Sequence, residues 1–151
     1  MRRGFKAEAE AYSQELRAEL RIQPYMPLCP WKLAEHLAIP VLALSDFAKQ
    51  EPKAVTHLCG KGKSAFSAVT VFYTPYSRVI VHNDKHNPYR QTSNIAHELA
   101  HGILGHPPTP PLNEQGCRHY DKAIEDEATW LGATLLVPRP AALHIVTSGL
   151  R

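Results

Sequence analysis

One short stretch of the sequence could bind a metal and do hydrolytic chemistry: His97-Glu98-Leu99-Ala100-His101, within a run that is typical of a helix. An α-helix turns by about 100° per residue, so residues four apart lie on one face. His97 and His101 can therefore both reach a single zinc ion, at about 2.0–2.1 Å. Glu98 projects beside that face, where its carboxylate can take a proton from a water molecule at the metal. The pattern predicts a zinc site with Glu98 as the catalytic base.

A catalytic zinc site usually has three protein ligands and one open position, so the two histidines need a partner. Glu127, on the next predicted helix, stands four residues before Leu131 and eight before Leu135, and shares their apolar face. A carboxylate that faces the core is costly unless it is paired or binds a metal. We therefore expect Glu127 to be the third ligand. Glu125 lies on a side nearer solvent and is the fallback ligand, or the acceptor of a hydrogen bond from a ligating histidine.

The same stretch can also be interpreted as a buried helix whose histidines are satisfied by hydrogen bonds alone. The downstream glutamates favour a metal, as do the small residues Ala96, Ala100 and Gly102, which allow a second helix to pack closely. Other polar residues near the motif are more typical of a surface, a strand end or a loop. We expect three of them to be dispensable for metal binding: His86, His106 and Cys117. His82 is interpreted in the same way. Either His119 or Tyr120 could stabilise an oxyanion, or both could simply be polar loop residues.

The elements that would position this site follow from apolar periodicity and from helix-capping residues. Asn87 and Pro88 are suited to the N-cap and first position of the motif helix, which should run to about Leu104 and end at Gly105. Asp121 can cap the helix that carries the two glutamates, and Pro138 ends it. The remaining expected elements are helices over 5–21, from residue 30 and over 140–146, a strand over 39–44, and a hairpin of strands over 67–73 and 78–82. This order predicts an α+β, zincin-like fold, with a small antiparallel or mixed sheet packed on the motif helix.

Composition excludes several classes of protein. The 151 residues carry a net charge of +3, with 44% hydrophobic and 21% charged residues, as in an ordinary globular domain. The basic residues near the start alternate with acidic ones, so we expect no direct binding to nucleic acid. No apolar run approaches the roughly 18 residues of a membrane span, and no secretory signal is present. Three widely spaced cysteines are typical of reduced thiols in the cytoplasm.

Two segments together resemble the ImmA/IrrE family of metallo-endopeptidases: residues 90–101, RQTSNIAHELAH, and residues 125–138, EDEATWLGATLLVP. The pairing of H-E-x-x-H with E-x-E-A and a leucine-rich stretch is far more specific than either half, and the resemblance extends upstream to cover nearly the whole chain. It implies that His97, His101 and Glu127 are zinc ligands and that Glu98 is the base. Family members are typically intracellular, and several cleave an Xre-type helix-turn-helix repressor, which switches on a stress or mobile-element response.

The sequence departs from the family pattern at two places. Leu131-Gly132 replaces the aromatic-alanine pair that usually follows E-x-E-A, which is a conservative change in packing. The chain also ends at Arg151, where similar proteins usually carry further helical sequence. We therefore expect residues 1–151 to form a single metallopeptidase domain that lacks a C-terminal extension, as a truncated or minimal member would.

The leading hypothesis is a zinc endopeptidase that cleaves an Xre-type repressor. One alternative is a peptide deformylase-like site with Cys59 as the third ligand, although the glycine-rich substrate motif of that family is missing. Another is a non-catalytic metal-binding regulator or sensor that binds the repressor without cleaving it. We expect a peptide substrate to pair with the strand over 67–71, provided that this strand is at the edge of its sheet and not inside it. Val69→Pro would then remove a main-chain donor to the substrate.

Overall fold

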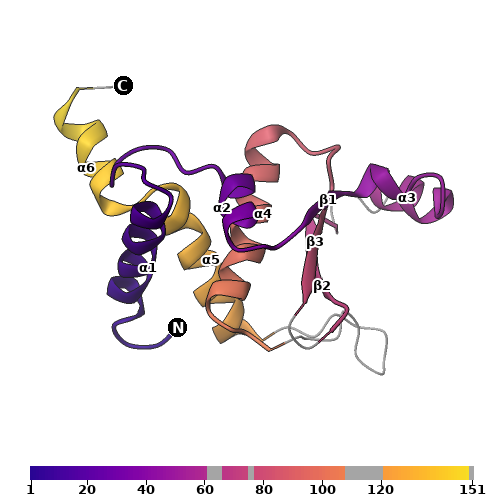
Figure 1. Cartoon of the computed structure of the whole chain (residues 1–151), viewed down its shortest axis with the longest axis horizontal. Coiled ribbons are helices and arrows are strands. Elements are labelled where there is room, and N and C mark those ends of the chain that lie inside the picture. Colours follow the sequence, from indigo (N-terminus) through magenta and orange to yellow (C-terminus); the bar gives the residue numbers. More distant parts are fainter. Residues whose placement is uncertain (61–65, 75–76, 108–120, 150–151) are drawn as a thin grey trace.

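The computed structural model describes residues 1–60, 66–74, 77–107 and 121–149 (Figure 1). Its elements, in chain order, are α1 (Phe5–Glu19), α2 (Pro30–His36), β1 (Val41–Ala43), the 3-10 turn η1 (Leu44–Phe47), α3 (Pro52–Cys59), β2 (Ala68–Phe72), β3 (Arg78–His82), α4 (Pro88–Ile103), α5 (Lys122–Leu136) and α6 (Arg139–Thr147). Helices and a small mixed sheet share one core, which confirms the predicted α+β class.

The sheet has three strands in the order β1-β3-β2. β2 and β3 form the predicted antiparallel hairpin, whereas β1 runs parallel to β3. Helix α4 packs on β2 and β3 with one side and on α5 with another, and α1 covers α5 from outside. Figure 1 shows these layers from α1 at one side, through α5 and α4, to the sheet. The motif helix therefore lies in the middle of the molecule.

The first turns of α4 and α5 are fixed by side-chain caps, as their sequences predict. Asn87 Oδ1 accepts a hydrogen bond from the main-chain N–H of Arg90 at 2.9 Å, and Pro88 occupies the first turn. Asp121 Oδ1 accepts from the N–H groups of Ala123 and Ile124 at 2.9 and 3.3 Å. These caps satisfy N–H groups that have no partner within the helix, and so they set where each helix begins.

The end of α4 is a Schellman motif, in which the chain turns back over the last helical turn. Gly105 has a φ of 63°, a left-handed conformation that glycine adopts without strain. The N–H of His106 donates to the carbonyl of His101 at 3.0 Å, and the N–H of Gly105 donates to that of Gly102 at 3.2 Å. This turn returns residue 106 to the helix face that carries His101.

The close approach of α4 and α5 depends on Gly132. A Cβ atom built on Gly132 would lie only 3.1 Å from both Cα and N of His97 and 3.2 Å from the carbonyl carbon of Ala96. These neighbours are main-chain atoms of a helix, which cannot move separately. Gly132, one of the two residues that depart from the family pattern, therefore allows the two site helices to touch.

The last turn of α5 is tied to α1 by a buried arginine. Arg17 is 1% exposed, and its Nη2 donates to the carbonyl of Leu135 at 2.8 Å. Its Nη1 donates to Ser13 Oγ at 2.6 Å, and that hydroxyl in turn donates to the carbonyl of Thr134 at 3.0 Å. A cation is favourable at a helix C-terminus, where carbonyl groups have no partner in the helix. Helix α1 thereby fixes one end of α5, and the other end carries the site glutamates.

Strand β2 lies at an edge of the sheet, and its hydrogen-bonding pattern shows which residues face outward. Ser67 O accepts from the N–H of Asn83 at 2.9 Å, and the N–H of Tyr73 donates to Ser77 O at 3.1 Å. Main-chain groups in an antiparallel pair point alternately toward and away from the partner, so residues 67, 69, 71 and 73 face β3. The N–H and C=O groups of Ala68, Thr70 and Phe72 therefore point to the free edge.

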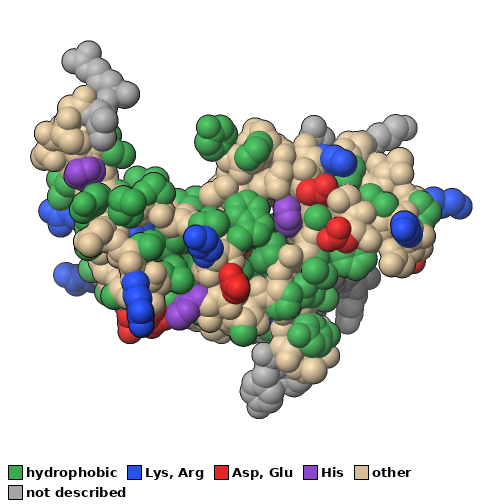
Figure 2. Space-filling model, turned by 45° about the horizontal axis from the view of Figure 1, so that its top comes forward, with side chains coloured by type: hydrophobic (Ala, Val, Ile, Leu, Met, Phe, Trp, Pro, Cys, Tyr) green, Lys and Arg blue, Asp and Glu red, His purple; other side chains and the backbone are tan. Residues whose placement is uncertain are grey.

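The surface carries charges of both signs. On the face drawn in Figure 2, Lys and Arg side chains are scattered among other residues and form no single patch. None of the helices in the described ranges is long and apolar enough to cross a membrane.

Candidate metal centre

Three side chains from α4 and α5 meet in one place: His97, His101 and Glu125. The Nε2 atoms of the two histidines are 3.1 Å apart. Glu125 Oε2 lies 3.3 Å from His97 Nε2, and Glu125 Oε1 lies 3.7 Å from His101 Nε2. Each of the three side chains is between 20% and 27% exposed, so solvent can reach the point on which they converge.

The spacing of these atoms fits a metal ion. Ligands at about 2.0–2.1 Å from a tetrahedral zinc ion lie about 3.3–3.4 Å from one another, and the three observed distances fall around that value. Two histidines and one carboxylate are also a donor set of catalytic zinc sites, which keep their fourth position open. Among the residues that the structure describes, no other group of three such ligands converges in this way. Three residues of this chain can thus hold a metal.

Glu127, the expected third ligand, is placed differently. Glu127 Oε1 accepts hydrogen bonds from the main-chain N–H and from Nε of Arg2, both at 3.0 Å. Burial favours the protonated carboxyl, but the two donors and the charge of Arg2 outweigh it and lower the pKa of Glu127. Glu127 is buried and paired, as its apolar face required, yet its partner is Arg2. The fallback residue Glu125 takes the place beside the histidines.

Helical geometry explains why the two glutamates have different neighbours in the structure. Residues two apart on a helix differ by about 200°, so Glu125 and Glu127 project to nearly opposite sides of α5. Periodicity identified the buried side correctly. It could not show that the N-terminal residues 1–4 cover that side, or that α4 approaches the other side. Which of the two glutamates faces the histidines therefore depends on contacts between elements that are far apart in the sequence.

His101 is oriented by a residue that the sequence analysis set apart from the site. His106 Nδ1 lies 2.9 Å from His101 Nδ1, and the Schellman motif at the end of α4 brings it there. A histidine that binds a metal through Nε2 carries its proton on Nδ1, and that proton can be donated to His106. Burial lowers the pKa of His106, which favours the neutral ring that accepts such a bond. Gly105, as a left-handed helix end, was the sequence signal for this contact.

The expected base, Glu98, lies on the side of α4 that faces the sheet. Thr70 Oγ1, on β2, donates a hydrogen bond to Glu98 Oε2 at 2.6 Å. This bond fixes the carboxylate beside the edge strand. His97 has a weaker neighbour on α5, since Thr129 Oγ1 lies 3.5 Å from its Nδ1. Sequence analysis identified neither threonine, because no motif relates them to the histidines.

The other candidate residues lie elsewhere. His82 is the last residue of β3, so the expected strand-end position is correct for it. Both His82 and His86 are buried, at 6% and 5% exposed, so neither is a surface residue. Cys59 has its sulfur 3.8 Å from Asn83 Oδ1 and does not join the histidines, which removes the basis of the deformylase-like alternative. Predictions that concern Cys117, His119 and Tyr120 fall outside the described residues.

Comparison with protein families gives one match. Residues 34–149 match the model Peptidase_M78, described as the IrrE N-terminal-like domain. No similar curated protein and no similar solved structure was found. The matched range spans most of the chain and contains the converging His97, His101 and Glu125. The chain therefore belongs to the IrrE N-terminal-like family of metallopeptidases, in agreement with its sequence motifs.

Proposed function

We propose that this protein is a zinc-dependent endopeptidase that hydrolyses a peptide bond in a protein substrate. The observation that carries the proposal is the arrangement of His97, His101 and Glu125 around one point, with Glu98 on the next face of the same helix. We assign the third ligand to Glu125 and the role of catalytic base to Glu98. Membership of a metallopeptidase family supports the same class of reaction.

The chain's own residues divide the chemistry between them. When bound, a zinc ion supplies Lewis acidity to the carbonyl group and to water. Glu98 then takes a proton from the attacking water and passes it to the leaving amine. The hydrogen bond from Thr70 holds the carboxylate in place for both transfers. His106 holds the ring of His101, so that its Nε2 remains directed at the metal.

The free edge of β2 is the proposed binding site for the substrate backbone. An extended peptide can add to an exposed sheet edge through main-chain hydrogen bonds, which tolerate varied side chains. Thr70 presents its N–H and C=O to that edge, while its hydroxyl contacts Glu98. A peptide that pairs with Thr70 thus lies next to the proposed base.

We further propose that the substrate is an Xre-type helix-turn-helix repressor and that cleavage, in the cytoplasm, relieves repression. The resemblance of the motifs to ImmA/IrrE endopeptidases supports this substrate. The free thiols of Cys29 and Cys59 are compatible with a reducing compartment. The competing possibility is a regulator that binds the metal and the repressor without hydrolysis.

Replacing Glu98 by Gln separates these two functions. The variant keeps all three proposed ligands but loses the base. We expect it to retain one zinc ion per chain and to leave a co-expressed Xre-type repressor intact, whereas the wild-type protein produces fragments that mass spectrometry identifies. Glu35→Gln, at an exposed position on α2, is the control and should cleave normally. Relief of repression by Glu98→Gln would instead identify a non-catalytic regulator.

The edge strand is tested with a pair of prolines. Ala68→Pro removes an N–H that points to the free edge, at the first residue of a strand, where proline is tolerated. We expect it to lower kcat/KM for peptides while zinc content and melting temperature change little. Val69→Pro removes an N–H that faces β3 and should destabilise the fold instead. Unchanged cleavage by a folded Ala68→Pro variant would place the peptide elsewhere.

A further inference from the structure

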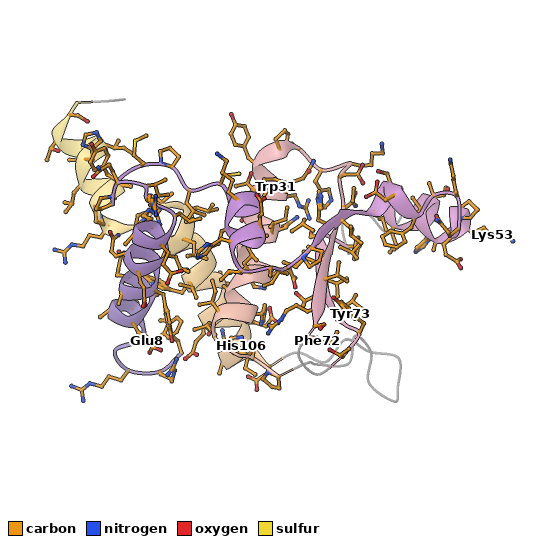
Figure 3. All side chains as sticks on the ribbon, viewed as in Figure 1. Glu8, Trp31, Lys53, Phe72, Tyr73 and His106 are labelled. Carbon is orange, nitrogen blue, oxygen red and sulfur yellow. The ribbon has the colours of Figure 1, made fainter. Side chains whose placement is uncertain are left out.

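A cavity of about 250 Å³ lies at one end of the sheet, where the last turn of α4, the β2–β3 hairpin and the segment between α2 and β1 meet. Its lining includes Ile39, Tyr73, Ser77, Arg78, Gly102 and Ile103. Phe72 and Tyr73, at the end of β2, are at the same end of the molecule as His106 (Figure 3). The cavity is separate from the three converging ligands, and the proposed chemistry does not use it.

Arg78 supplies a positive charge to this cavity. Its guanidinium group stacks over the ring of Phe72, with Cζ 5.1 Å from the ring centroid. A Cβ atom on Gly102 would lie 3.1 Å from Arg78 Nη1, so the lack of a side chain there admits the guanidinium against α4. The end of a helix favours a nearby cation, which explains why the charge is tolerated. Within the described ranges, however, Arg78 forms no ion pair and donates no side-chain hydrogen bond.

The cavity lies one helical turn along α4, and two residues along β2, from the proposed catalytic base Glu98 and its partner Thr70. Gly102 follows Glu98 by four residues, so it lies on the same face of α4, about 6 Å further along the axis. Phe72 follows Thr70 by two residues, so it shares the same face and the same free edge of β2, about 7 Å further along. A peptide bound along β2 with its scissile bond at Glu98 therefore has another residue beside Phe72, the residue whose ring carries the guanidinium group of Arg78.

We propose that this cavity is a specificity pocket, in which Arg78 binds a carboxylate side chain of the substrate two or three residues from the bond that is cut. The inference rests on the proposed peptidase function. A guanidinium group presents several N–H donors in a planar fork that matches a carboxylate, which makes aspartate or glutamate the best-fitting residue. Tyr73 and Ser77 line the same space, and each has a hydroxyl group of the kind that can donate to a carboxylate.

Cleavage of a proteome-derived peptide library, read by mass spectrometry, tests the preference. We expect wild-type cleavage sites to be enriched in Asp or Glu at one position two or three residues from the cut. For a matched pair of peptides with Glu or Gln at that position, kcat/KM should differ by about tenfold or more, as expected for hydrogen bonds to a charged group. Arg78→Gln should bring this ratio close to one, and Arg78→Glu should favour Lys at the same position.

Two further variants control for damage to the fold. Arg78→Lys keeps the charge but loses the fork, so it should retain a reduced preference for Glu over Gln. Arg90→Gln removes a different arginine, which contacts Ser67 at the other end of β2, and should keep the full ratio. An equal ratio for wild type and Arg78→Gln, or loss of the preference in Arg90→Gln alone, would overturn the assignment to Arg78.

A binding measurement separates this inference from the proposed catalytic function. In the zinc-loaded Glu98→Gln variant, the NMR signal of the Arg78 Nε–H group is followed while a blocked glutamate or a blocked glutamine amino acid is added. We expect a saturable shift with the glutamate compound only. If the wild-type protein cleaves no peptide while Glu98→Gln shows this shift, the result would keep the pocket and refute the peptidase. No shift at Arg78 would refute the pocket even where cleavage occurs.

Discussion

Two carboxylates on α5, only two residues apart, have different partners. Glu125 faces the Nε2 atoms of both histidines, whereas Glu127 is held by Arg2. We expect Glu125→Gln to weaken zinc binding by more than the 10- to 100-fold that is typical of residues around a ligand shell, because it removes a ligand. Glu127→Gln should weaken it much less. Competition with a chelator of known affinity measures both effects.

The partner of Glu127 provides a control for that comparison. Arg2→Gln removes the guanidinium part of the same contact and keeps the main-chain N–H, so its effect on zinc binding should be small, like that of Glu127→Gln and unlike that of Glu125→Gln. A larger loss of zinc from Glu127→Gln than from Glu125→Gln would restore Glu127 as the third ligand.

The contact between His106 and His101 leads to a second prediction. His106→Ala removes the acceptor that fixes the His101 ring and should lower zinc affinity by about 10- to 100-fold. His106→Gln, whose side-chain oxygen can accept the same proton, should recover part of that loss. His57→Ala, at an exposed position on α3, should bind zinc like the wild type. Equal affinities for His106→Ala and His57→Ala would show that the contact has no role in metal binding.

At the scale of elements, the distance between α4 and α5 determines whether three ligands can meet. Gly132→Ala places a methyl group 3.1 Å from main-chain atoms of His97 and should push the helices apart. We expect a loss of about 1–3 kcal/mol in the free energy of unfolding, as for other overpacked sites, together with weaker zinc binding. Urea unfolding and zinc titration measure the two effects.

Gly102→Ala is the matched control, since it also adds a methyl group to a helical glycine. Its closest neighbour is the end of the flexible Arg78 side chain, which can move. Alanine favours a helix by up to about 1 kcal/mol over glycine, so this variant should be unchanged or more stable. Similar destabilisation in both variants would mean that helix contact at Gly132 is not the cause.

The sequence predicted the boundaries of helices correctly where neighbouring residues set them. Helix starts at Asn87 and Asp121 were correct because a side-chain cap needs only its own helix, and Gly105 marked the end of α4 for the same reason. The edge strand was also identified, but not its hydrogen-bonding register, so Val69 was expected to face the substrate when its N–H faces β3. The register is set by the pairing of two strands, which composition alone does not encode.

The site itself was predictable only in part. His97, Glu98 and His101 form a local motif on one helix, so their relation follows from helical geometry. The contributions of Thr70, His106 and Arg2 come from β2, from the turn after α4 and from the N-terminal residues. These contacts arise when the elements pack together. Because these three residues belong to no sequence motif, their contribution to the site could not be recognised from the sequence alone.

At the scale of the whole molecule, a buried histidine links stability to pH. Burial lowers the pKa of His82 below its ordinary value, although Asp84 and Asp46 partly oppose this shift. As the pH falls below about 6.5, the unfolded chain takes up this proton before the folded protein does. The contribution of neutral His82 to stability is therefore complete above that pH and is lost progressively below it.

We expect His82→Phe, which keeps an aromatic ring but cannot titrate, to lose less stability than the wild type between pH 7.5 and pH 5.5. Urea unfolding at both pH values measures the difference. Both proteins carry the same proposed metal ligands, so effects of pH on metal binding cancel in the comparison. Parallel loss of stability in the two proteins would show that His82 is not the titrating group.

The outward-facing main chain of Ala68, Thr70 and Phe72 has a consequence for what controls cleavage. A short edge can accept only a partner that is already extended, and a segment inside a stable helix has its own N–H and C=O groups engaged. The energy needed to open that segment is then added to the activation barrier of every cleavage event. Under the proposed function, a repressor whose cleavable segment unfolds on release from DNA or from a partner would become a substrate without any change in this protein. The conformation of the substrate would then determine whether cleavage occurs.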